Sequence, residues 1–404
     1  MKMFPKVLII SEFSFNKVSG TGILFTNLFE DFPEENIALI HEDRSFKSEK
    51  HKFCLCIKSQ NFFLENLLNF FPLKLKLFIK EFKNLILKNF FFIRRRKDET
   101  IDNFIESFNP DIIYTILGNN EMMSLIKNII EKYNIPLVTH IMDDFINSES
   151  NVRNIEQHDL FNYFIENSVL RLAINKKMSI DYAKRYRLPF HVIHNGLDRR
   201  KIQNIKCLNS EIKQITYIGS IYKNAQLHSI IDISFAVTSL NKKGKKIKLN
   251  LYLPKNQLQK FKSSFSQNEN IIIKINDMGD KDYFSKISHS DLLILAANFD
   301  KESISYYSLS WPAKMASYLM SGIPIFIYGP SNIYFISEAM KKKWALVCNK
   351  REVLFLEDSI CNILYDIKTK NIIVKNALKE SKNFDLKRIK DEFKKKIMQS
   401  VNIK

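Results

Sequence analysis

The sequence predicts an α/β protein made of two Rossmann-like, doubly wound domains that face each other across a cleft. Short apolar runs alternate with amphipathic helical stretches along most of the chain, which indicates parallel sheets covered by helices on both faces. The alternation stops at a polar segment, 204–214, and then starts again. A length of 404 residues suits two such domains.

The first half of the chain opens with an apolar run at 6–10, a polar loop that contains Gly20, Thr21 and Gly22, and helical spacing from 23 onward. Between later runs, residues 119–134 repeat apolar side chains every three or four positions, as a helix does. The strands expected after the first are 37–40, 111–117, 135–141, 171–175 and 190–194. We therefore expect an N-terminal domain over 1–200.

The second half repeats this organisation over 210–375, and helix-forming, lysine-rich residues 376–404 are expected to close the fold. Helices are expected near 226–240 and from about Pro312. The expected strands are 215–219, 247–253, 271–275, 291–296, 323–329 and 345–348. Doubly wound domains bind ligands at the carboxyl ends of their strands, so facing edges would form one interdomain site.

Composition narrows the class of protein. The formal net charge is +19, with 45% hydrophobic residues and only 9 glycines, which excludes a disordered or collagen-like chain. Five cysteines without paired CxxC spacing indicate neither a disulfide framework nor a zinc site. This cysteine pattern fits a reducing cytoplasm. Because the chain contains no uninterrupted run of about 18 apolar residues, we do not expect it to span a membrane.

Several short blocks stand in a consistent order: SGTGI after the first strand, PLVTHIMDDF, FHVIHNGLD at the domain junction, YIGS, and SLSWPAKMASYLMSGIPIFIYGP. With them the chain resembles GT-B glycosyltransferases, in particular the family-4-like enzymes of bacterial surface polysaccharide synthesis. The resemblance implies transfer of a sugar from a nucleotide diphosphate sugar to a hydroxyl of a lipid-linked or growing surface glycan. It implies no cofactor and no obligatory metal.

The resemblance implies a diphosphate site in the second domain, yet no arginine occurs between Arg200 and Arg351. Gly219 is followed by Ser220, where a Gly-Arg pair is expected. Lysines and backbone N–H groups must then neutralise the phosphates. The candidates are Gly219, Lys223, Ser308, Ser310 and Lys314, with Lys314 favoured because it lies at a predicted helix start. Alternatively, Lys223 and Lys314 are solvated surface lysines.

The catalytic base is expected from the first domain. His140 ends a predicted strand and Asp143 follows within one turn, so either could accept the proton of the acceptor hydroxyl. Alternatively, His140 is a buried strand residue and Asp143 caps a helix. Gly20, Thr21 and Gly22 are expected to line the cleft as a loop, with a plain tight turn as the alternative. His194 is expected in a hinge strand.

Two positions depart from the pattern of the family. Many retaining members carry paired glutamates where this chain has Leu309 and Ser317, and Glu302 is a possible substitute. The triplet from Asp280 to Asp282 matches a DxD metal motif, but matches of this length are common by chance. These departures put the stereochemical outcome, and activity itself, in question.

Residues 61–97 combine nine Lys or Arg with nine Phe. The segment is either an ordinary domain helix or a contact with an anionic membrane surface. The membrane reading uses Lys76, Lys80, Lys83, Arg94, Arg95 and Arg96. Nucleic-acid binding is not expected, because no binding motif organises these residues.

Three functions compete. The leading one is a glycosyltransferase that is cytoplasmic or peripheral on the inner face of the cytoplasmic membrane, with a nucleotide sugar and a lipid-linked glycan as its partners. The second is a nucleotide-sugar epimerase on the same fold. The third is a non-catalytic subunit that binds a partner glycosyltransferase or the membrane.

Overall fold

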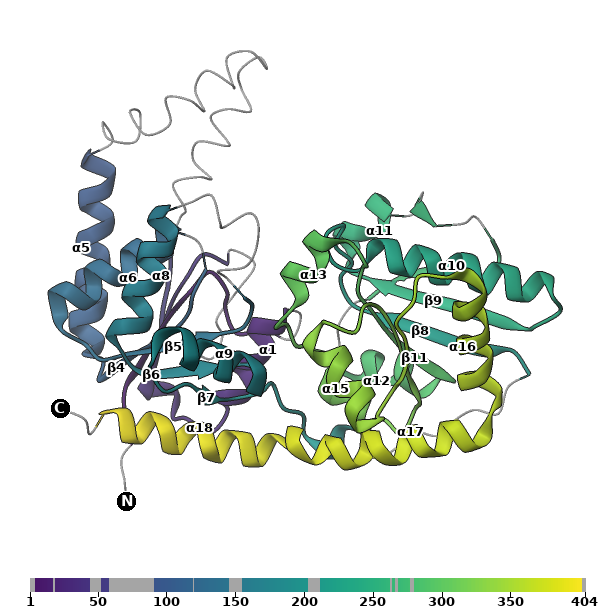
Figure 1. Ribbon diagram of the computed structural model, residues 1–404. Helices are drawn as coiled ribbons and strands as arrows, with labels where there is room; N and C mark the ends of the chain where they lie inside the picture. Colours follow the sequence, from purple (N-terminus) through teal and green to yellow (C-terminus); the bar gives the residue numbers. More distant parts are fainter. Residues whose placement is uncertain are drawn as a thin grey trace, which may run out of the picture.

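The computed structural model describes residues 4–16, 19–43, 52–57, 91–118, 120–144, 155–202, 211–261, 264–265, 268–276 and 280–401. Two parallel sheets, each with helices packed on both faces, organise these residues into two domains (Figure 1). The predicted α/β architecture is confirmed.

The N-terminal sheet has seven parallel strands in the order β3-β2-β1-β4-β5-β6-β7. From β1 the chain adds strands first toward β3 and then, beginning with β4, on the other side of β1, as in a doubly wound fold. The strands are β1 (Val7–Ser11), β2 (Ile37–His41), β3 (Phe53–Cys56), β4 (Ile112–Ile116), β5 (Leu137–Ile141), β6 (Ser168–Ala173) and β7 (His191–Val192).

Helices cover both faces of this sheet, which explains why its central strands are apolar at almost every position. Helices α1 and α18 share one cluster of buried side chains with the sheet, whereas α5, α6 and α8 lie over the other face. The helices are α1 (Gly20–Leu28), α5 (Phe91–Phe108), α6 (Asn120–Tyr133), α8 (Ile155–Asn167), α9 (Lys176–Tyr186) and α18 (Leu386–Val401), with 3-10 turns η1 (Glu34–Asn36) and η2 (Arg199–Ile202).

The C-terminal sheet has six parallel strands in the order β10-β9-β8-β11-β12-β13. The direction in which successive strands are added changes between β8 and β11. Its strands are β8 (Lys213–Ile218), β9 (Ile247–Leu253), β10 (Ile271–Ile275), β11 (Leu292–Ala296), β12 (Ile325–Tyr328) and β13 (Leu346–Cys348).

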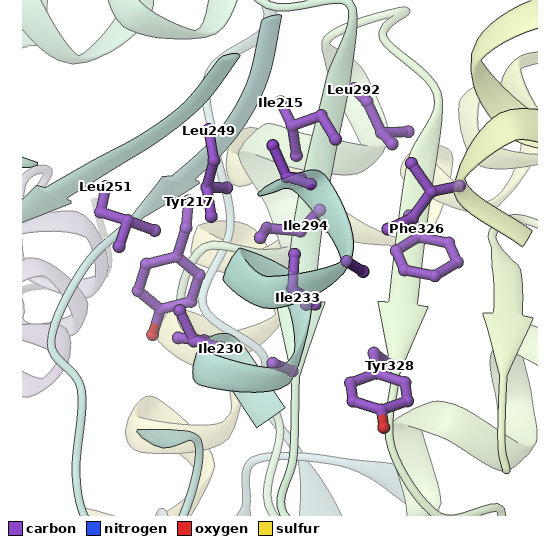
Figure 2. Close-up of a cluster of buried hydrophobic side chains, with 14 of the residues drawn as sticks. Ile215, Tyr217, Ile230, Ile233, Leu249, Leu251, Leu292, Ile294, Phe326 and Tyr328 are labelled. Carbon is purple, nitrogen blue, oxygen red and sulfur yellow. The ribbon is translucent and has the colours of Figure 1, made fainter. Parts of the chain in front are cut away.

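Helix α10 packs its apolar side on this sheet because Ile230, Ile233 and Val237 recur at helical spacing. Figure 2 shows Ile230 and Ile233 among the buried side chains of this sheet. Helix α16 shares that face, and α12, α14 and α15 contribute to the cluster on the other. The helices are α10 (Leu227–Lys242), α11 (Lys255–Phe261), α12 (Asp280–Ser288), α13 (Lys301–Tyr307), α14 (Met315–Met320), α15 (Tyr334–Lys342), α16 (Val353–Tyr365), α17 (Ile367–Glu380) and the 3-10 turn η4 (Ser381–Phe384).

The chain crosses between the domains twice, and the two crossings are hydrogen-bonded. The N–H of Leu197 donates to the carbonyl of Phe384 at 3.0 Å, and the N–H of Leu386 donates to the carbonyl of Leu197 at 3.3 Å. Helix α18, yellow in Figure 1, then returns to the N-terminal sheet, where Phe393 contacts Phe29 with ring centroids 5.2 Å apart.

The helices within the described ranges include none long and apolar enough to span a membrane. Three of the residues predicted to contact a membrane, Lys76, Lys80 and Lys83, lie outside the described residues. Arg94, Arg95 and Arg96 fall in the first turns of α5, in the stretch whose side chains are also outside the described part of the chain.

Candidate functional site

The carboxyl ends of the two sheets meet at the domain junction. Ser310, between α13 and α14, donates a hydrogen bond to Oδ1 of Asp143 at 3.3 Å. At the start of α1, a Cβ on Gly20 would lie 3.3 Å from Cβ of Ala313. A small pocket of about 20 Å³ lies between the domains, lined by Met142, Ile174, Asn195, Trp311, Pro312, Ala313, Met315 and Ala316. These contacts define the interdomain cleft.

Lys314 lies at the start of α14 on the C-terminal wall of this cleft. Its Nζ lies 3.7 Å from the centroid of the Tyr217 ring, in a cation–π contact. Burial lowers the pKa of Lys314 to about 7, and no carboxylate contributes to that shift. An amine held in a desolvated place without an anionic partner is a site that an anion would stabilise.

Gly219 lies directly beside this amine. Its φ is +128°, which side chains rarely tolerate, and a Cβ there would lie 3.1 Å from Nζ of Lys314. The glycine therefore gives the turn after β8 its conformation and leaves room for the amine. The structure thus brings together two of the predicted diphosphate-binding residues.

The other three predicted phosphate contacts lie elsewhere in the hydrogen-bond network. Lys223 is exposed, and its carbonyl accepts a hydrogen bond from Nδ2 of Asn298 at 2.8 Å. The Ser308 hydroxyl donates to the carbonyl of Ser305 at 3.0 Å, as at the end of a helix. Since Ser310 contacts Asp143, neither serine hydroxyl is directed to a cluster with Lys314.

Asp143 lies on the N-terminal wall of the cleft. The residue is exposed as a whole, yet burial of its carboxyl at the junction raises the pKa of that group. The hydrogen bond from Ser310 opposes that rise, and the charge of Asp144 adds to it. Asp144 itself is buried and accepts a hydrogen bond from the Tyr182 hydroxyl at 2.9 Å. Asp143 is therefore the member of the pair that faces the cleft.

His140 is fully buried in β5. Its Nδ1 lies 2.7 Å from the hydroxyl of Tyr114, and burial lowers the pKa of His140 to about 3. A neutral, enclosed imidazole is poorly placed to take a proton from a substrate, so the geometry separates the two base candidates in favour of Asp143. Burial also lowers the pKa of His194, to about 4, beside Phe384 at the domain junction.

Gly20, Thr21 and Gly22 form the first turn of α1, so the expectation of a loop was wrong. The hydroxyl of Ser19 accepts a hydrogen bond from the N–H of Gly22 at 3.0 Å, and this cap starts the helix three residues earlier than apolar spacing indicates. A Cβ on Gly22 would lie 2.3 Å from the Asn16 side chain, so the second glycine serves local packing.

The two positions at which many retaining family members carry glutamates, 309 and 317, hold side chains that contact other residues of this protein. Leu309 is buried among side chains of the N-terminal domain, and Ser317 shares a hydrogen bond of 2.6 Å with the Tyr283 hydroxyl. Glu302 is exposed in the first turn of α13. Asp282 pairs with Lys286, and the described residues contain no group of three side chains suited to a metal ion.

Sequence reasoning missed two residues that shape the cleft. Tyr217 supplies the aromatic surface under Lys314, and its place in the YIGS block was the signal that could have found it. Asn175 joins the domains by donating a hydrogen bond from Nδ2 to the carbonyl of Leu309 at 2.6 Å. A helix cap at Asn175 is readable from sequence, but its contact across the junction is not.

No protein-family model matches the sequence, and a search of curated proteins finds no match. Solved structures match almost the whole chain. Anabaena HepE in complex with UDP-glucose is 12% identical, with a TM-score of 0.62 over 97% of this chain and 99% of that chain. A UDP-forming α,α-trehalose-phosphate synthase from Burkholderia vietnamiensis is 9% identical, with a TM-score of 0.67 over 98% and 99%.

A glycosyltransferase from Rickettsia africae is 11% identical, with a TM-score of 0.63 over 100% of both chains. At such identities the likeness establishes the architecture and not the chemistry. The two facing Rossmann-like domains of this chain have the GT-B fold.

Proposed function

We propose that the protein is a glycosyltransferase that uses a nucleotide diphosphate sugar. The observation that carries the proposal is the amine of Lys314, which has no carboxylate partner among the described residues and lies beside Gly219 at the carboxyl end of β8. A diphosphate would supply the missing negative charge, and the departing diphosphate of a sugar transfer needs such stabilisation. HepE was solved with UDP-glucose and with UDP, so UDP is the first nucleotide to test.

Asp143 completes the proposed chemistry from the opposite wall. Its raised pKa makes the carboxylate a better proton acceptor than an ordinary surface aspartate. An acceptor hydroxyl near Asp143 would lose its proton as its oxygen attacks the anomeric carbon, while the bond from that carbon to the diphosphate breaks. The Ser310 hydroxyl holds Oδ1 of Asp143 and leaves the second carboxylate oxygen for the substrate.

The proposed acceptor is a lipid-linked or growing surface glycan, with the enzyme cytoplasmic and peripheral on an anionic membrane. Support comes from the net charge of +19 and from the basic, phenylalanine-rich segment 61–97. Replacing Arg94, Arg95, Arg96 and Lys97 by glutamine should reduce sedimentation with anionic vesicles. Unchanged sedimentation would contradict the membrane contact and leave the proposed sugar transfer intact.

A second candidate is a subunit that binds a nucleotide without turnover. It is favoured by Leu309 and Ser317, which replace paired carboxylates with a packed leucine and a hydrogen-bonded hydroxyl. Binding of UDP without release of sugar from any UDP-sugar, in the presence of glycan acceptors, would favour this candidate.

The test of the donor site is thermal stabilisation by UDP, GDP, CDP and ADP. Lys314→Ala should weaken binding of the stabilising nucleotide by roughly 10- to 150-fold, since a hydrogen bond to a charged group contributes about 1.5–3 kcal/mol. Lys223→Ala is the matched control, because this lysine belongs to the same wall but is exposed. Absence of stabilisation by all four nucleotides, or equal binding by Lys314→Ala, would overturn the proposal.

A further inference from the structure

The segment between α13 and α14 belongs to the C-terminal domain by sequence but packs into the N-terminal domain. Leu309 is only 5% exposed. It lies in a cluster whose other buried members all come from the N-terminal domain: Ile141, Phe161, Ile165, Ala173, Ile174, Met178, Tyr182 and Phe190. A leucine of one domain therefore completes the core of the other.

The neighbouring Trp311 secures the same segment at the hinge. Its ring stacks on Phe384 with an interplanar angle of 11° and centroids 5.7 Å apart. Phe384 lies at the second chain crossing, where its carbonyl accepts the hydrogen bond from Leu197. The segment 309–311 thus contacts both the N-terminal core and the point about which the domains would rotate.

One side chain fixes the backbone of this segment. Asn175 is 1% exposed, and the two ends of its amide make different hydrogen bonds. Oδ1 accepts from the N–H of Met178 at 2.9 Å and so caps α9, while Nδ2 donates to the carbonyl of Leu309 at 2.6 Å. Because the first partner is a donor and the second an acceptor, only an amide in this orientation satisfies both.

The next residue links this contact to the cleft. Ser310 donates to Oδ1 of Asp143, and Lys314 follows at the start of α14. Since Asn175 and Asp143 belong to the N-terminal domain, the hydrogen bond to Leu309 sets where the C-terminal wall stands relative to Asp143. In Figure 1, α9 and α13 lie on the two sides of the junction that this bond closes.

We propose that Asn175 is a positioning residue: it latches the segment 309–311 to the N-terminal domain and so holds the cleft closed, with Asp143 and Lys314 facing one substrate. The role in turnover rests on the proposed glycosyltransferase function, whereas the role in domain closure does not.

Asn175→Asp tests the latch, because aspartate keeps an acceptor for the N–H of Met178 but has no N–H for the carbonyl of Leu309. The matched control is Asn241→Asp. Asn241 also donates from Nδ2, to Val237 and Ile247, and accepts from the N–H of Ile247, but these partners lie within the C-terminal domain.

The experiment measures the interdomain distance by spin labels on exposed residues of α6 and α10, the dissociation constant of UDP, and kcat. We expect Asn175→Asp to lengthen and broaden the distance distribution and to lower kcat about tenfold, while the dissociation constant of UDP changes less than about twofold. Asn241→Asp should leave both the distance and kcat at wild-type values. Should Asn175→Asp fail to fold, Asn175→Ser keeps a capping hydroxyl and is measured in its place.

A distance distribution for Asn175→Asp equal to that of the wild type, or a change matched by Asn241→Asp, would overturn the proposal. If the wild type binds no nucleotide, the proposed function fails, but the distance measurement still decides whether Asn175 latches the domains. If the cleft opens without loss of kcat, Asn175 holds the domains but does not position Asp143, and the proposal is overturned in that part.

Discussion

Asp143 on the N-terminal wall of the cleft and Lys314 on the C-terminal wall are both shifted toward their neutral forms. The pKa of the carboxyl is raised and that of the amine is lowered to about 7, in each case chiefly by desolvation. Neither group contributes to the shift of the other, so they are not an ion pair. The comparison teaches that each wall holds a titratable group whose charged form lacks a partner of opposite charge within the described part of the chain. A bound polar substrate would stabilise that charged form.

The largest expected effect separates the two candidate bases on the N-terminal wall. Asp143→Asn should lower kcat by about 10²- to 10⁴-fold, the usual contribution of a general base, and leave the dissociation constant of UDP unchanged. His140→Asn should instead lower the melting temperature, because Tyr114 loses a buried hydrogen bond. If His140→Asn were the variant with the larger loss of kcat at equal stability, the assignment of Asp143 would be wrong.

On the C-terminal wall, Gly219→Ala should weaken UDP binding and lower stability. The φ of +128° costs an alanine about 1–3 kcal/mol, and the new Cβ would displace the amine of Lys314. Gly244→Ala is the control, since Gly244 has a φ of +85° but no described atom within 4 Å of the place that its Cβ would take. It should lower stability by a similar amount and leave UDP affinity unchanged, as measured by calorimetry.

Acid should destabilise the region behind the N-terminal wall and the hinge. The pKa values of His140 and His194 are lowered to about 3 and about 4, so the unfolded chain takes up protons first as the pH falls below 6.5. Each histidine should then cost about 1.4 kcal/mol of unfolding free energy per pH unit down to its folded pKa. Urea unfolding at pH 7, 6, 5 and 4.5 checks this slope.

The smallest expected effects are losses of stability from removing the N-terminal caps of α1 and α13, one helix on each wall. Ser19→Ala removes the cap of α1 and should cost about 1 kcal/mol, and Asp300→Ala should do the same to α13, where its carboxylate accepts from the N–H of Ser303. Chemical denaturation measures both. Asp300→Ala, on the wall proposed to bind the nucleotide, should also alter UDP affinity, whereas Ser19→Ala should not; an equal change from Ser19→Ala would show that the walls are not independent.

The alternation of apolar runs was sufficient to predict both sheets, because parallel strands covered on two faces are apolar almost throughout. Because both faces of the sheet are buried, the apolar pattern could not predict whether His140 is enclosed or reaches the cleft. The start of α1 was misplaced because a single hydroxyl, Ser19, outweighed the apolar spacing. Leu309 could not be assigned to the other domain, since local pattern carries no information on its contact with Asn175, 134 residues away.

The return of α18 to the first sheet has a consequence for biosynthesis. Ile389, Phe393 and Ile397 fill the cluster beneath α1 and β4, and Lys390 is held by Glu30 and Asp31. On the ribosome, the first domain emerges long before residues 386–401 do, so the part of this face that α18 covers stays exposed while the second domain is made. The domain that is translated first is thus completed only when α18 docks on it.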